Sequence, residues 1–142
     1  MESGFLHWGY DISPEENQYE ANLNFSISFK KDYDFIGKES LLKMKDKKPK
    51  KRLIMLCLQE SKPGEPLMLH DEPIYLDNKI IGVTTSGNYS FNFSKNLAFG
   101  YIKSDHSDLE LSKKNLFIEI EKIKYPAEVL LNPLKQTDFK KM

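Results

Sequence analysis

The spacing of apolar and polar residues changes near residue 50. From there to residue 131, short apolar runs alternate with turn residues at intervals of roughly ten residues, a pattern typical of an all-β sandwich or barrel. The first run, 52–59, is apolar on both faces and is therefore expected to be a central strand. The further strands are expected at 73–76, 79–85, 97–102, 116–121 and 125–131.

Turn-forming residues separate these strands. Asp77-Asn78 lies between two apolar runs and predicts a tight hairpin turn. Pro126 falls inside the last strand, and because proline cannot donate to a ladder it indicates an edge position or a bulge. Residues 104–112 are polar and expected to be a loop, and 132–142 form a basic, polar tail.

The stretch 79–102 combines two of the strands with a polar loop. Ser86-Gly87-Asn88 is expected to break the first strand, because Gly and Asn tolerate positive φ and Ser and Asn bond the nearby backbone. An aromatic loop at 88–94 would then lead into the next strand. A loop rich in Ser, Asn, Tyr and Phe between two firm strands is suited to presenting a binding surface. The pattern fits equally well a long surface hairpin that binds no ligand.

The first 47 residues are less regular. Residues 23–30 alternate apolar and polar side chains with period two, which predicts a half-buried strand. Residues 34–47 are expected to be a helix with an apolar inner face and a charge-rich end. Ser13, followed by Pro14, is a suitable cap for one short helical turn.

Composition fits one ordinary domain, or one small domain with an incomplete neighbour. The chain has 142 residues, of which 39% are apolar and 12% aromatic, enough for a real core. Its 21 basic and 21 acidic side chains give a formal charge of zero. Phosphate binding needs a positive field, so nucleic acid is not expected as the main partner. The basic run 43–52 is expected to be a solvated linker, with contact to an anion as the alternative.

No secretory or membrane-spanning segment is visible, so a cytoplasmic, soluble protein without a membrane partner is expected. Cys57 stands alone in an apolar run and is expected to be a small buried hydrophobe. The three histidines, His7, His70 and His106, are scattered without metal-site spacing, so no metal ligand is predicted.

Catalytic motifs are missing as well. The chain contains no nucleophile elbow, phosphate loop or dinucleotide-binding glycine pattern, so no catalytic residue is predicted. Asp11, Glu15, Glu16 and Glu20 form an acidic cluster, which is expected to be a solvated face. These residues by themselves indicate a mostly β domain that binds something, without visible chemistry.

Nine short motifs in a fixed order cover nearly the whole chain. They are MESGF (1–5), WGYDISP (8–14), YEANL (19–23), DFIGKE (34–39), LL (41–42), KRL (51–53), GVTTSG (82–87), SKNLAFGY (94–101) and YPAEV (125–129). Together they resemble the C-terminal part of the glycine-cleavage T-protein (aminomethyltransferase) family. The resemblance is greatest to the folate-binding half of dimethylglycine and sarcosine dehydrogenases.

The resemblance implies a mostly β chain in two parts. Residues 1–47 would be the α+β tail of a folate-binding aminomethyltransferase domain, and 48–142 its C-terminal antiparallel β-barrel or jelly-roll-like domain. Proteins of this family transfer a one-carbon unit to tetrahydrofolate in a cavity shared by three domains. Their catalytic aspartate would lie upstream of Met1. The chain alone is therefore expected to be catalytically incomplete, as a piece of a larger enzyme or as a short gene product that needs a partner.

The resemblance also implies a set of folate-binding residues, which are Glu2, Tyr10, Asp11, Ser86 and Tyr89. The two tyrosines would stack on a flat heteroaromatic ring, and Asp11 would accept hydrogen bonds from its amino groups. The alternatives are core packing for the tyrosines and turn geometry for Ser86 and Gly87. Residues 133–136 depart from the family's pattern, so no folate contact is carried over to the tail.

Two functions follow from different classes. In the first, the chain is part of a tetrahydrofolate-dependent aminomethyltransferase or demethylase, and folate and the one-carbon donor bind through the missing domains. In the second, it is a non-catalytic binding or assembly module that docks on another subunit. We also expect the isolated chain to form a homo-oligomer that covers the edge of the predicted 23–29 strand, Phe5 and Trp8.

Overall fold

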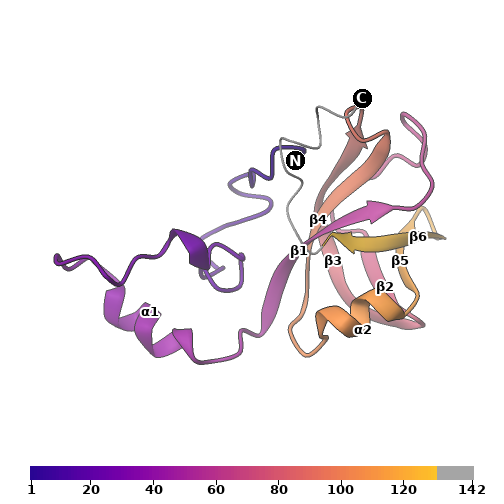
Figure 1. The fold of residues 1–142 in the computed structure, drawn as a ribbon. Coiled ribbons are helices and arrows are strands. Elements are labelled where there is room, and N and C mark those ends of the chain that lie inside the picture. Colours follow the sequence, from indigo (N-terminus) through magenta and orange to yellow (C-terminus); the bar gives the residue numbers. More distant parts are fainter. Residues whose placement is uncertain (131–142) are drawn as a thin grey trace.

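A computed structural model describes residues 1–130 of the chain, and its main feature is a closed antiparallel barrel (Figure 1). The strands are β1 (Lys51–Leu58), β2 (Pro73–Leu76), β3 (Lys79–Ser90), β4 (Lys95–Lys103), β5 (Leu116–Ile120) and β6 (Ile123–Leu130). They are hydrogen-bonded in the order β1-β4-β3-β2-β5-β6, and β6 closes the barrel against β1. The expected β-barrel is confirmed.

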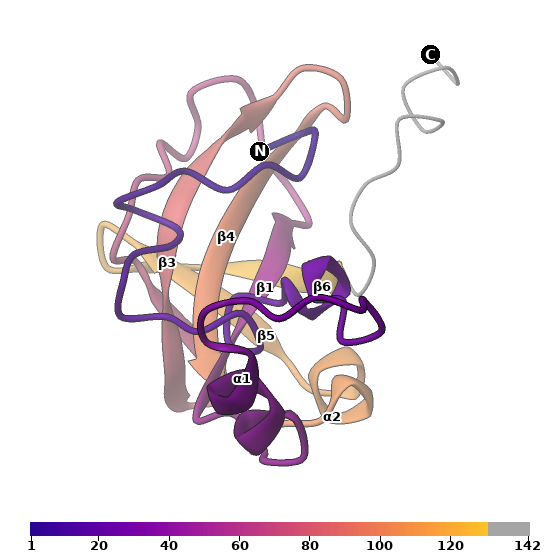
Figure 2. The ribbon, with the colours of Figure 1, turned by 90° about the vertical axis from the view of Figure 1, so that its left-hand side faces the viewer.

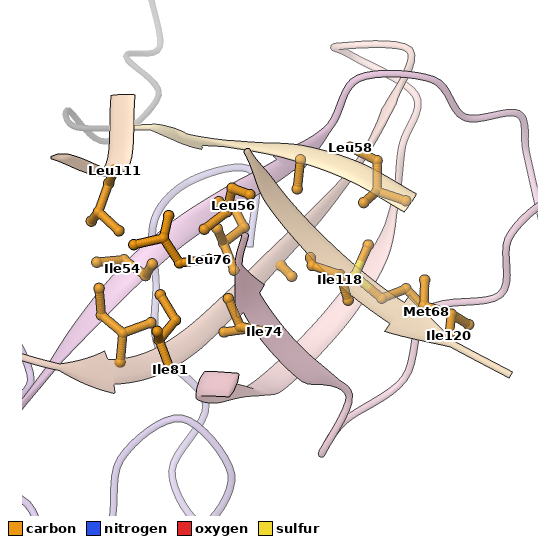
Figure 3. Packing of buried hydrophobic residues seen from close by; sticks show 14 residues of the cluster. Ile54, Leu56, Leu58, Met68, Ile74, Leu76, Ile81, Leu111, Ile118 and Ile120 are labelled. Carbon is orange, nitrogen blue, oxygen red and sulfur yellow. The ribbon is translucent and has the colours of Figure 1, made fainter. Parts of the chain in front are cut away.

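Apolar side chains from all six strands fill the barrel. The members of this core, shown in Figure 3, are Ile54, Leu56, Leu58, Met68, Ile74, Leu76, Ile81, Ala98, Ile102, Leu111, Leu116, Ile118, Ile120 and Ala127. Met68 comes from the connection between β1 and β2, and Leu111 from the helix α2 (Asp108–Lys113). These two side chains lie at opposite ends of the cluster.

A second apolar cluster lies on the outer face of β1 and β4, where Leu53, Met55, Phe99 and Tyr101 point away from the barrel axis. Residues 1–21, called here the N-terminal strap, cross in front of β4 and β3 as the indigo segment in Figure 2. Met1 and Leu6 of the strap pack against the cluster. The strap thus buries the second face of β1, as the doubly apolar sequence of that strand predicted.

The predicted strand at 23–30 is wrong. The chain forms a short 3-10 helix at Asn24–Ser26, and the amide and hydroxyl of Ser26 both donate to the carbonyl oxygen of Leu23. The Phe25 side chain is 82% exposed. An alternating segment becomes a strand only if another strand pairs with it, and none does among residues 1–130. Residues 1–47, predicted to be an α+β tail, therefore contain helices but no strand.

Two helices differ from their predicted extents. The helix α1 spans Lys38–Lys45, shorter than 34–47, because Gly37 at φ 90° precedes its first turn. The helix α2, Asp108–Lys113, covers the second half of residues 104–112, which were expected to be a loop, and extends one residue beyond them. Ser107 caps α2 by accepting a hydrogen bond from the Glu110 amide at 3.2 Å. The Ser-x-x-Glu spacing is the signal that the polar composition concealed.

The predicted strand break at 86–88 is also wrong. Ser86, Gly87 and Asn88 continue β3 and pair with Phe99, Ala98 and Leu97 of β4. A shift of register between Thr84 and Ser86 absorbs the extra residue as a bulge. The turn between the strands is therefore confined to residues 91–94.

Pro126 is neither at an edge nor in a bulge, because β6 pairs with β1 on one side and β5 on the other. The amide of Gln59 donates to the Pro126 carbonyl at 3.0 Å, just past the end of β1. The position where proline lacks an N–H group thus lies just beyond the last residue pair of β1 and β6, Leu58 and Ala127. The turn at Asp77-Asn78 is confirmed between β2 and β3. The predicted tail at 132–142 and the departure at 133–136 lie outside the described residues.

In the part of the chain that the structure describes, no helix has the length and apolar character needed to cross a membrane.

Candidate functional site

Asp11 anchors the N-terminal strap to the barrel. Its side chain is 2% exposed, and its Oδ1 accepts hydrogen bonds from the hydroxyls of Thr85 at 2.6 Å and Ser86 at 2.7 Å. Its Oδ2 accepts from the His7 amide at 2.8 Å, and its carbonyl accepts from the Tyr101 hydroxyl at 3.0 Å. Asp11 and Ser86, both predicted site residues, therefore touch each other, and protein donors already occupy both carboxylate oxygens.

Glu2 holds the other end of the strap against the turn between β3 and β4. Its carboxylate accepts hydrogen bonds from the Ser90 hydroxyl, and from the Asn92 side-chain amide at 2.5 Å. The hydrogen bond from Ser90 lowers the pKa of Glu2 below its usual value, and those from Asn92 add to this against the opposing effect of burial. Glu2 therefore remains an ionised acceptor at neutral pH.

A cavity of about 500 Å³ lies between the start of the strap and the end of this hairpin. We call it the hairpin cavity; it is lined by Met1, Glu2, Ser3, Phe5, Asn88, Tyr89, Ser90, Phe91 and Leu97. The rings of Tyr89 and Phe91 meet edge to face, with their centroids 5.1 Å apart. The cavity thus combines aromatic rings with the Glu2 carboxylate, an arrangement suited to a flat ring that carries N–H donors.

Tyr10 lies elsewhere. Its ring is exposed and packs between the imidazoles of His7 and His70, at centroid distances of 5.1 and 5.9 Å. It borders a second hollow of about 510 Å³. We call this hollow the strap groove; it is lined by Tyr10, Glu16, Lys51, Ile80, Ile81, Gly82, Val83, Thr85, Tyr101, Ile102 and Lys103. The five predicted site residues are therefore divided between two hollows, with the Asp11–Ser86 contact between them.

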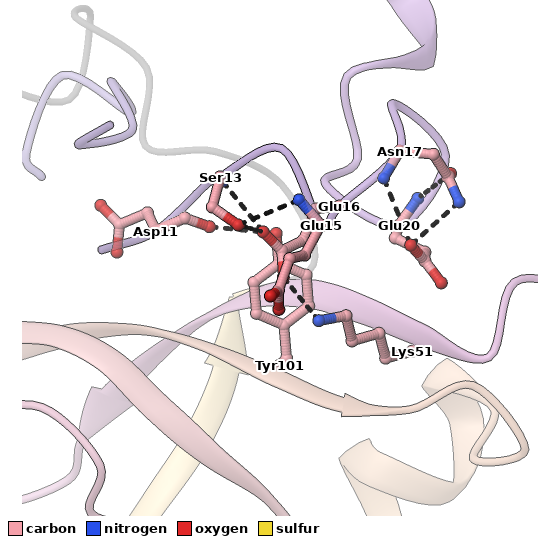
Figure 4. A network of polar contacts seen from close by, with 8 residues as sticks. All are labelled: Asp11, Ser13, Glu15, Glu16, Asn17, Glu20, Lys51 and Tyr101. Atoms are coloured by element: carbon pink, nitrogen blue, oxygen red, sulfur yellow. Dashed lines mark hydrogen bonds and ion pairs between the residues drawn. The ribbon is translucent and has the colours of Figure 1, made fainter. Parts of the chain in front are cut away.

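The acidic cluster of the strap is not a solvated face, contrary to the sequence-based expectation. Asp11 and Glu20 are buried, Glu16 is half-buried, and only Glu15 is exposed. Figure 4 shows the contacts that remove them from solvent: Ser13 and Lys51 bind Glu16, and Asn17 binds Glu20. The missed signal is again a polar cap followed three residues later by glutamate.

Glu16 and Lys51 form an ion pair, with Nζ 2.6 Å from Oε1. The Lys51 ammonium lies 4.7 Å from the centre of the Tyr101 ring. Partial burial acts to raise the pKa of Glu16, but the hydrogen bonds from Lys51 and Ser13 and the charge of Lys51 outweigh it, so the pKa is lowered. Burial raises the pKa of the Tyr101 hydroxyl, which therefore stays a hydrogen-bond donor.

Cys57 is buried, as expected of a small hydrophobe in this apolar run, and burial raises the pKa of its thiol. Within residues 1–130, no group of three His, Cys, Asp or Glu side chains is arranged to hold a metal ion.

The lowered pKa values of Glu2 and Glu16 predict an acid-sensitive strap. Both groups stabilise the folded chain above their usual pKa of 4.5, and this contribution is lost as the pH falls through their lower folded-state values. We expect the melting temperature to fall between pH 5 and about pH 3. Glu16→Gln should flatten this dependence, whereas Glu60→Gln, an exposed control outside the strap, should not. Identical pH profiles for the two variants would contradict the role of Glu16.

Comparison with known proteins adds independent information. The sequence profile described as "Glycine cleavage T-protein C-terminal barrel domain" matches residues 51–135. Human dimethylglycine dehydrogenase is 34% identical over 97% of this chain, and the aminomethyltransferase of Listeria welshimeri is 32% identical over 94%. The chain spans only 15% and 35% of the lengths of these two relatives.

A solved structure is similar in fold. It is the glycine cleavage system aminomethyltransferase T from Bartonella henselae, with a TM-score of 0.76 and 22% sequence identity. The similarity covers 95% of this chain and 36% of that one. The likeness thus extends beyond the barrel to the strap and α1.

Proposed function

The chain belongs to the glycine cleavage T-protein family, whose C-terminal barrel domain it contains, and from this premise we propose that it is part of a tetrahydrofolate-dependent aminomethyltransferase or demethylase. In this proposal a one-carbon unit is transferred to tetrahydrofolate, and this chain contributes one wall of the folate cavity. The other walls and the catalytic aspartate come from residues equivalent to the unmatched parts of the relatives, on the same or another polypeptide.

The hairpin cavity is the observation that supports this role. It brings together Glu2 and Tyr89, which lie far apart in the sequence. Its volume of about 500 Å³ falls within the range of small-molecule sites. The Glu2 carboxylate already accepts from Ser90 and Asn92, but unlike Asp11 it is only half-buried, and its Oε2, which accepts one hydrogen bond, can take another from an N–H group of a heteroaromatic ring. The ring of Tyr89 or Phe91 can stack on the face of that ring.

The remaining predicted residues fit a supporting role better than a direct one. The carboxylate of Asp11 is occupied by Thr85, Ser86 and His7, so it holds the strap, and thereby Glu2, in place. Tyr10 borders the strap groove instead of the hairpin cavity. Direct folate contacts of Tyr10, Asp11 and Ser86 stay predictions, as does a cytoplasmic location.

The proposal predicts that folate binding needs more than this chain. By calorimetry, we expect no saturable binding of tetrahydrofolate to the chain alone, even at millimolar concentration. A chimera, in which this chain replaces the matched third of the Listeria welshimeri aminomethyltransferase, should bind it. In the chimera, Glu2→Ala should weaken binding about tenfold, the effect of losing one hydrogen-bonded charge.

Matched variants separate binding from folding in that experiment. Tyr89→Phe keeps the ring and should bind nearly normally, whereas Tyr89→Ala should weaken binding. Lys113→Ala changes an exposed lysine of α2, away from the cavity, and should have no effect. A folded chimera that binds tetrahydrofolate equally well with Glu2→Ala and Tyr89→Ala would overturn the proposed wall.

Exposed apolar side chains support a second candidate, a non-catalytic binding or assembly module. Phe5, Phe25 and Ile36 are 81%, 82% and 105% exposed, and α1 contains no buried residue. Another subunit or a second copy of the chain would cover them, although the predicted strand edge at 23–29 is not there to be covered. Sedimentation of the isolated chain distinguishes the two occupants, and a folded chimera without folate binding would favour this candidate.

A further inference from the structure

The strap groove is separate from the hairpin cavity and shares no lining residue with it. Tyr10 and Glu16 of the strap form one wall, and residues of β1, β3 and β4 form the other. Its volume of about 510 Å³ is large enough for a small molecule. The folate proposal therefore leaves this hollow without a role.

Two lysines meet at one end of the groove. Lys51 and Lys103 are directly paired residues of β1 and β4, and both line the groove. Side chains that face each other in an antiparallel pair project from the same face, with Cβ atoms about 5 Å apart. Both positive side chains therefore start from the same end of the groove.

Only one of the two positive charges is neutralised. Glu16 pairs with Lys51 at 2.6 Å, and among the described residues that line the groove it is the one acidic residue. Lys103 is exposed, and among residues 1–130 no carboxylate lies within ion-pair distance of it. The end of the groove therefore carries a net positive charge.

The rest of the groove presents apolar surface to solvent. Ile80 and Val83 of β3 are 55% and 42% exposed, and the exposed ring of Tyr10 lines the same groove. Branched aliphatic side chains beside a flat ring form a surface that an apolar group would cover at a gain in free energy. The positive end and the apolar surface lie in the same hollow.

We propose that the strap groove binds a small carboxylate that carries an aromatic or aliphatic body. The carboxylate accepts hydrogen bonds from Lys103 and from the remaining N–H groups of Lys51. The body covers Ile80 and Val83 beside the ring of Tyr10. Glu16 is an internal competitor, because it supplies Lys51 with a carboxylate whether or not the ligand is present.

Because Glu16 competes with the ligand, changes at Glu16 and at Lys103 should alter the ligand affinity in opposite directions. Phenylacetate is the probe, titrated into the full chain and followed by ¹H–¹⁵N NMR, and phenylacetamide is its uncharged counterpart. Shifts should saturate for amides at 80–83 and 101–103. Glu16→Gln should tighten binding and Lys103→Gln should weaken it, each about threefold, as for one exposed charge pair.

Two controls show whether phenylacetate binds through its charge and in the strap groove. Lys113→Gln removes an exposed lysine outside the groove and should leave phenylacetate binding unchanged. Phenylacetamide should bind at least about threefold more weakly than phenylacetate. Equal binding of the two probes, or an unchanged affinity in folded Lys103→Gln, would overturn the proposal. Neither result bears on the hairpin cavity, so the folate proposal stands or falls separately.

Discussion

Gly82→Ala is expected to destabilise the barrel by at least about 3 kcal/mol, the upper range for an overpacked interior. A Cβ atom at this position would lie 1.9 Å from the Tyr101 carbonyl oxygen and 2.9 Å from the Cα of Ile102. Both obstacles are backbone atoms of β4, so a side-chain rearrangement cannot relieve the contact. The two strands would have to separate where Gly82 pairs with Ile102.

Urea denaturation followed by circular dichroism measures this effect, and Gly87→Ala is the matched control on the same strand. A Cβ atom on Gly87 would meet mainly the Met68 side chain, with Cγ at 2.6 Å, and the Leu69 carbonyl oxygen at 3.0 Å. The methionine side chain can move, so we expect a loss of about 1–2 kcal/mol. If Gly82→Ala is no less stable than Gly87→Ala, this would contradict the close approach of the β3 and β4 backbones at Gly82.

The second large effect is expected for Asp11→Ala, which should lower the free energy of unfolding by about 3 kcal/mol, the range for removing a buried charged acceptor. The change deletes the acceptor of three hydrogen bonds and leaves the hydroxyls of Thr85 and Ser86 without it. It also frees the strap at its middle. Limited proteolysis should then cleave the first 50 residues faster while the barrel stays protected.

Two variants show whether the carboxylate itself is responsible. Asp11→Asn keeps the shape and one acceptor oxygen, so its loss should be smaller than that of Asp11→Ala. Glu15→Ala changes an exposed acid of the same strap and should stay within about 0.5 kcal/mol of the unchanged protein. Asp11→Ala with unchanged stability and unchanged proteolysis of the strap would contradict the anchoring role.

The strap connects these stability effects to the two hollows. Its residues Met1, Glu2, Ser3 and Phe5 border the hairpin cavity, and Tyr10 and Glu16 border the strap groove. Asp11 lies between them and ties both to β3. Loosening this one contact should therefore disturb both hollows.

The sequence alone determined most of the barrel. Runs such as 52–59 and 116–121 have strand length, are rich in apolar residues and lie between turn residues, and β1 and β5 lie where they were expected. The doubly apolar character of β1 also implied a cover on each face. The ordered motifs of the chain, from WGYDISP to YPAEV, indicated the family that the comparisons show.

Only the tertiary structure decided what the ambiguous segments became. Residues 23–30 have the alternation of a strand but no partner strand, and Ser86-Gly87-Asn88 has the composition of a turn but pairs with β4 through a bulge. Local sequence states which conformations a segment tolerates, whereas hydrogen bonds with distant residues select one of them. The predicted site residues are separated for the same reason. Hydrogen bonds from Ser90 and Asn92, both distant in sequence, hold Glu2 at the hairpin cavity, whereas the path of the strap places Tyr10 at the strap groove.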